Sequence, residues 1–116
     1  MANLDVQSLA SQMLSAALPI LKKGVTDIQT FAKSEFTLIA QRIVSIGEQL
    51  AEGKAGLPGG INEEQARLLL DMQKNASRST LLTVEGLGLL MVEQAINAAL
   101  GAVRKAVNAA LGIALL

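Results

Sequence analysis

The sequence predicts an all-α protein, and three observations carry that prediction. Apolar residues make up 51% of the 116-residue chain, yet Phe31 and Phe36 are the only aromatic residues. The apolar positions recur at steps of three and four rather than two, which is the period of a helix face. Residues 95–101 return eleven residues later as 106–112. Because eleven residues make three helical turns, both copies present the same face. Alanine-rich, aromatic-poor helices of this kind are suited to close packing against one another.

A glycine-rich loop divides the chain into two helical arms. Residues 53–61 contain four of the ten glycines and Pro58, so no helix is expected to cross them. Asn62 and Gln65 then match a capping box at a helix start. We therefore expect residues 1–116 to form a single helical domain. Its arms, about 3–52 and 62–116, fold back as a long antiparallel hairpin.

The first arm has a continuous apolar seam that two features interrupt. Pro19 lacks a helical donor, and Gly24 follows two lysines in a pattern typical of a helix end. Thr26 and Gln29 match a second capping box. The continuity of the seam favours one helix, kinked near 19–26, over two separate helices. We expect the seam to be buried, and both phenylalanines to belong to the core. The seam comprises Leu14, Leu18, Leu21, Val25, Ile28, Ala32, Phe36, Ile39, Ile43, Ile46 and Leu50.

The second arm is weakened over residues 75–88. Residues 73–80 are nearly all polar, and Gly86 and Gly88 each disfavour a helix by about 1 kcal/mol relative to alanine. A kink is one outcome. A break here, together with a break in the first arm, would give a four-helix bundle instead of a hairpin.

The C-terminal helix has more apolar surface than a two-helix hairpin can cover. Placed on a helical wheel, residues 89–116 show a bulky stripe of Leu, Val and Ile and a separate smooth face of small residues. The second face needs another helix, from this chain or from another copy. We expect it to mediate self-association into a homo-oligomer or filament. Its members are Ala95, Ala99, Ala102, Ala106, Ala110 and Ile113.

Charge is unevenly distributed along the chain. Lys plus Arg and Asp plus Glu balance at ten each, and no basic cluster indicates a nucleic-acid partner. All but four of these twenty residues fall within 22–85. Residues 1–21 and 86–116 would form a charge-poor base at the end opposite the loop. Such a base is expected to contact protein or lipid. No signal peptide is evident, and the default expectation is a cytoplasmic protein.

The composition excludes the commonest catalytic and metal-binding groups. There is no His and no Cys, and no phosphate-binding or dinucleotide-binding motif occurs, so we predict no catalytic residue, cofactor or metal site. Glu85 and Glu93 attract attention because each interrupts an apolar stretch. We expect them to be interfacial, paired with Arg104 or Lys105 of a neighbouring copy.

Three functions are compatible with these observations. The favoured one is a non-enzymatic structural or interaction protein that self-assembles through its C-terminal arm. The second is a membrane-associated protein whose charge-poor base contacts lipid. The third is a helical bundle that binds an apolar ligand, for which the sequence offers no specific group.

Overall fold

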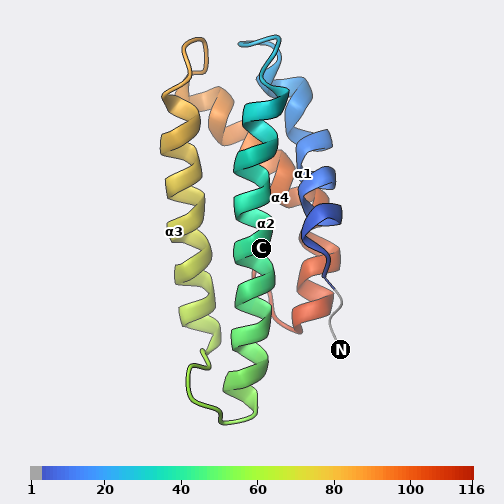
Figure 1. Cartoon of the computed structure of the whole chain (residues 1–116), viewed down its shortest axis with the longest axis vertical. Helices are drawn as coiled ribbons and strands as arrows, with labels where there is room; N and C mark the ends of the chain where they lie inside the picture. Colours follow the sequence, from blue (N-terminus) through green and yellow to red (C-terminus); the bar gives the residue numbers. More distant parts are fainter. Residues whose placement is uncertain (1–3) are drawn as a thin grey trace.

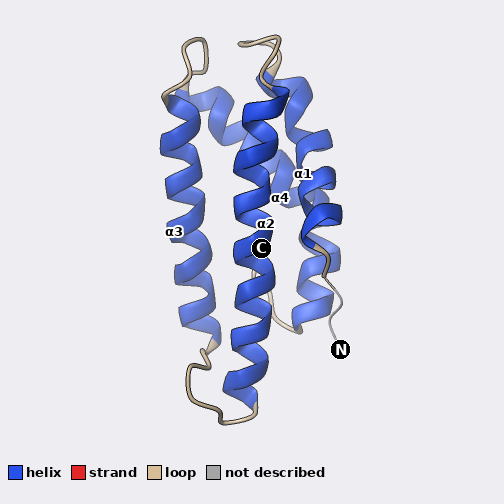
Figure 2. Cartoon of the chain, viewed as in Figure 1, coloured by secondary structure: helices blue, strands red, loops and turns tan. Residues whose placement is uncertain are grey.

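The computed structural model describes residues 4–116 and contains four helices (Figure 1). They are α1 (Val6–Leu21), α2 (Gln29–Lys54), α3 (Glu63–Leu82) and α4 (Leu89–Leu111). Helices and loops account for all of the described chain (Figure 2). The all-helical prediction is confirmed, and of the two predicted arrangements the molecule adopts the four-helix bundle.

The first arm is two helices rather than one kinked helix. Pro19 is accommodated in the last turn of α1, and the helix ends at Leu21 just before Lys22 and Lys23. The expected capping box of Thr26 and Gln29 does not form, because α2 begins at Gln29 after Ile28 and has no side-chain cap. The chain therefore turns back on itself over residues 22–28.

This break changes which side of α1 faces the core. The seam predicted along α2 is buried from Ile28 to Leu50, and Phe36 lies at its centre. In α1 the buried side chains are instead Leu9, Ala10, Met13, Ala17 and Leu21, whereas Leu14 and Leu18 are only partly buried. A seam keeps its phase only along an uninterrupted helix. Once the helix breaks, α1 is free to rotate relative to α2. Phe31, which we expected in the core, is exposed at the start of α2.

The start of α3 forms as the sequence predicts. The Asn62 side chain accepts a hydrogen bond from the Gln65 N–H at 2.8 Å, and the Gln65 side chain accepts one from the Asn62 N–H at 3.0 Å. The preceding loop is slightly shorter than predicted, since α2 continues to Lys54. The polar residues 73–80 do not interrupt α3, which continues to Leu82.

Two glycines hold the α1–α2 and α3–α4 connections together. Gly86 has a φ of +99°, a conformation that side chains other than glycine rarely adopt. A Cβ atom on Gly86 would lie 2.9 Å from the Gly24 carbonyl oxygen, and a Cβ atom on Gly24 would collide with the Gly86 carbonyl oxygen. The two backbones can therefore meet only because neither residue has a side chain.

The bundle is elongated, measuring 46 × 22 × 19 Å. Consecutive helices alternate in direction, and the α1–α2 and α3–α4 connections lie at the end opposite the α2–α3 loop (Figure 1). α1 packs against α2 and α4, and α2 packs against α3. α4 runs obliquely behind α2 (Figure 1). The charge-poor segments thus lie side by side along the bundle as α1 and α4, instead of forming a base at one end.

Candidate functional site

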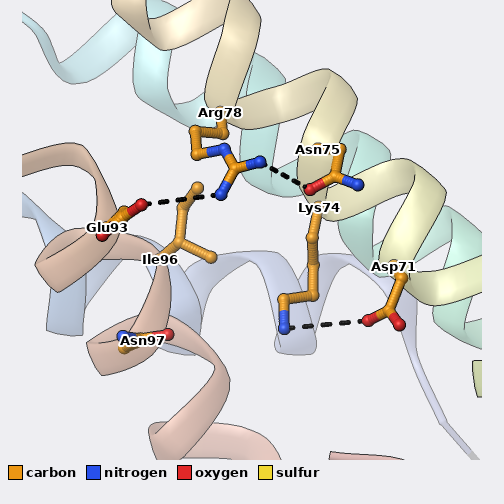
Figure 3. A pocket seen from close by; sticks show the side chains of 7 residues that line it. All are labelled: Asp71, Lys74, Asn75, Arg78, Glu93, Ile96 and Asn97. Atoms are coloured by element: carbon orange, nitrogen blue, oxygen red, sulfur yellow. Dashed lines mark hydrogen bonds and ion pairs between the residues drawn. The ribbon is translucent and has the colours of Figure 1, made fainter. Parts of the chain in front are cut away.

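A groove opens between α3 and α4 because these two helices contact each other much less than α2 contacts α3. It encloses about 330 Å³, and both helices contribute to its lining (Figure 3). The lining residues are Asp71, Lys74, Asn75 and Arg78 from α3 and Glu93, Ile96 and Asn97 from α4.

Ion pairs organise the walls of this groove. The Arg78 guanidinium lies 3.5 Å from the Glu93 carboxylate across the groove and donates a hydrogen bond of 2.8 Å to the Asn75 side chain (Figure 3). The Lys74 ammonium lies 4.0 Å from the Asp71 carboxylate on the same helix. Both carboxylates therefore have a cation beside them. The groove thus presents charged groups of both signs around one apolar residue, Ile96.

The C-terminal segment lies beside the groove. A second hollow, of about 210 Å³, shares Asp71, Lys74 and Asn97 with the first and is also lined by Leu115 and Leu116. The Asn108 side chain holds this segment by accepting a hydrogen bond from the Leu116 N–H at 3.0 Å and donating one to the Leu116 carbonyl at 3.3 Å. Leu115 and Leu116 therefore border the gap between α3 and α4, and two hydrogen bonds hold Leu116 to α4.

The predicted self-association face of α4 divides into covered and uncovered parts. The chain itself buries three of the six positions, which are Ala95, Ala99 and Ile113. Ala102 and Ala106 are exposed, and Ala110 is half-buried. The first half of the alanine line thus finds its cover inside the bundle, where α4 packs chiefly on α1.

The four charged residues predicted to be interfacial occupy different surroundings. Glu93 pairs with Arg78 of its own chain. Glu85 is exposed in the α3–α4 connection, and Arg104 and Lys105 are exposed on α4. Glu93 thus has a cation beside it from its own chain, and this cation is neither Arg104 nor Lys105.

Sequence reasoning also missed a polar pair inside the bundle. Glu35 on α2 is only 8% exposed, and Ser77 on α3 is fully buried. Burial raises the pKa of the Glu35 carboxyl above its ordinary value, and a hydrogen bond with the Ser77 side chain partly offsets that rise. The Gln73 side-chain amide donates to the Ser77 hydroxyl at 3.1 Å. The available signal was the position of Glu35 on the buried side of α2, three residues after Ala32 and four before Ile39.

Neither a metal site nor a membrane span is found in the described chain. Over residues 4–116, no three Asp, Glu, His or Cys side chains are grouped so that they could hold a metal ion. The helices of this same stretch are too short or too polar to cross a bilayer. A scan against protein-family models and searches of curated proteins and solved structures find no match to this chain.

Proposed function

We propose that this protein is a non-enzymatic structural or interaction protein that self-assembles through the uncovered part of α4. The observation that carries the proposal is the alanine line of that helix. Ala95 and Ala99 are buried within the chain, whereas Ala102 and Ala106 continue the same line at the surface. Because Ala95 and Ala99 pack against another helix, Ala102 and Ala106 have the same composition needed to pack against a further helix.

The physical argument rests on close backbone approach. Small side chains let two helices approach closely, so that backbone and Cβ atoms gain many van der Waals contacts at once. α4 carries only three charged residues, Glu93, Arg104 and Lys105, so bringing two copies together desolvates few charges. Two copies related by a two-fold axis would present the same face to each other, which is the commonest geometry of homo-oligomers.

To test the proposal, the mass of the native particle is measured for the wild-type protein and for variants with an altered α4 surface. Sedimentation velocity over a range of protein concentrations should show a species larger than one chain. Ala102→Glu and Ala106→Glu each place a carboxylate in the proposed contact, and we expect either to return the protein to a single chain with its helicity unchanged. Gln94→Glu is the matched control, because Gln94 is exposed on α4 but lies away from the alanine line. It should leave the mass of the particle as it is.

Two results would contradict the proposal. One is a folded wild-type protein that remains a single chain at high micromolar concentration. The other is an assembly that persists in both alanine variants, because its contact would then lie elsewhere on the molecule.

A further inference from the structure

Residues 113–116 fold back along the bundle after α4 ends. Gly112 closes the helix with a φ of +71°, the left-handed conformation that glycine adopts readily at a helix end. Beyond it the chain reverses direction and returns towards the middle of the bundle (Figure 1). Ile113 and Leu115 are buried and Ala114 between them is exposed, which is the alternation of an extended segment with one side against the protein. We call residues 113–116 the strap.

Hydrogen bonds tie the strap to both helices that border the α3–α4 groove. The Asn108 side chain on α4 accepts a hydrogen bond from the Leu116 N–H at 3.0 Å and donates one to the Leu116 carbonyl at 3.3 Å. On the other side, the Arg67 Nε of α3 donates to the Ala114 carbonyl at 3.4 Å. The strap therefore bridges two helices that otherwise contact each other little.

The apolar side of the strap borders leucines from the same two helices. Leu115 and Leu116 line the smaller hollow together with Leu70 of α3 and Leu100 of α4. With the strap in place, Leu70 is only 3% exposed and Leu100 only 7%. About 210 Å³ of hollow remains beside these side chains, so the strap covers the gap without filling it.

We infer that the strap is releasable and that it closes the gap between α3 and α4. It is four residues long, lies outside the helices and is anchored by three hydrogen bonds, so its release breaks far fewer contacts than unfolding of the bundle. Segments held in this way open locally while the rest of a protein stays folded. Gly112 supplies the hinge, because glycine has the widest choice of backbone conformations.

Release of the strap changes the surface that the gap presents. The two hollows share Asp71, Lys74 and Asn97, so they are parts of one continuous gap. In the closed state its accessible lining is mainly charged and amide groups. In the open state Leu70 and Leu100 lose their cover and join that lining. The strap thus controls access to the apolar part of the gap, a device separate from self-assembly through α4.

Thiol labelling of the full chain tests this inference. The chain has no cysteine, so one introduced thiol is the only reporter. Leu70→Cys places that thiol beneath the strap, and its rate of reaction with an aromatic disulfide reagent measures how often the strap opens. We expect slow labelling that depends little on urea below the unfolding transition, because a local opening exposes little surface.

Loosening the strap should speed up this labelling. Asn108→Ala removes both hydrogen bonds to Leu116, and we expect it to raise the rate at Leu70→Cys by about tenfold or more. Alanine favours a helix more than asparagine does, so α4 itself is not weakened by the substitution. Far-UV circular dichroism confirms that each variant remains folded.

The chain supplies a matched control for each substitution. Leu81→Cys places a thiol at a fully buried position of the same helix, outside both hollows. Its labelling should rise steeply with urea and should not respond to Asn108→Ala. Asn97→Ala removes the exposed asparagine at the same position of the first repeat copy. It should leave the rate at Leu70→Cys unchanged.

Three results would overturn the inference. If Leu70→Cys showed the same urea dependence as Leu81→Cys, the strap would open only when the whole bundle unfolds. If Asn108→Ala left the rate at Leu70→Cys unchanged, the strap would not be what covers this position. An equal rise at both thiols would show a general loss of stability. Self-assembly is read out separately by sedimentation, so either proposal can fail without the other.

Discussion

Glu35 shows how one side chain couples the α2–α3 interface to pH. The residue is only 8% exposed, its side chain is hydrogen-bonded to Ser77, and burial raises the pKa of its carboxyl in the folded state. The folded protein therefore holds the proton more tightly than the unfolded chain does. The contribution of this proton to the free energy of unfolding is fully present below the pKa of Glu35 in the unfolded chain. It is lost as the pH rises through the pKa of Glu35 in the folded protein. Raising the pH above the unfolded pKa therefore lowers the free energy of unfolding.

Replacing this carboxylate by a neutral isostere should stabilise the protein at neutral pH. We expect Glu35→Gln to raise the free energy of unfolding near pH 7 by a few tenths to about 1 kcal/mol, because the variant no longer buries a charge and retains an acceptor for Ser77. Below the unfolded pKa the difference should disappear. The measurement is urea unfolding followed by far-UV circular dichroism, since the chain has no Trp or Tyr to report by fluorescence.

Glu48→Gln provides the comparison for this measurement. Glu48 is an exposed glutamate on the same helix, so its substitution should change stability little at either pH. An equal gain from both variants would show that overall charge, rather than burial of Glu35, is responsible.

At the scale of the element, α3 depends on its N-terminal cap. The Asn62 and Gln65 side chains satisfy each other's backbone N–H groups, and Glu63 and Glu64 complement the helix dipole. Asn62→Ala should lower the free energy of unfolding by about 1 kcal/mol, because it leaves an N–H of the first turn without its partner. Urea unfolding measures this loss.

The reciprocal variant Gln65→Ala should cost less than Asn62→Ala, because it removes the return bond and keeps the cap itself. If Asn62→Ala left stability unchanged, the capping box would contribute nothing to the stability of α3.

At the scale of the whole molecule, charge and packing divide the bundle into two layers. α2 and α3 carry most of the charged residues, and α1 and α4 lie against each other with few. The proposed assembly places the exposed end of the alanine line, on the charge-poor layer, between copies. Folding and assembly are then linked, because only the folded chain can associate.

This linkage predicts that thermal stability depends on concentration. The unfolding midpoint of the wild-type protein should rise with protein concentration, because mass action favours the assembled folded state. The midpoint of Ala102→Glu should be independent of concentration and close to that of wild type at high dilution. Scanning calorimetry or circular dichroism at several concentrations checks both. A wild-type midpoint that does not change with concentration would argue against assembly in that range.

The sequence by itself determined the helical class, the mid-chain loop, the capped start of α3 and the seam of α2. These features depend on residues that are near one another in the chain. The glycines and Pro58 end one helix, and Asn62 with Gln65 starts the next. The spacing of three and four residues between apolar positions from Ile28 to Leu50 holds within one helix. The same local reasoning identified the absence of His and Cys, and with it the absence of the commonest catalytic groups.

Only the tertiary structure decided which face of α1 and which part of α4 are covered, and by which helices. The seam could not reveal that α1 rotates after the break, since its phase is not transmitted across residues 22–28. Ala95 and Ala106 occupy the same position in the two copies of the repeat, so the sequence could not reveal that the first is buried while the second is exposed. Cover depends on where α1 crosses α4. Likewise, Arg78 meets Glu93, and Gly24 meets Gly86, through contacts between residues far apart in the chain. Such contacts depend on how whole helices are placed, and helical periodicity describes each helix separately.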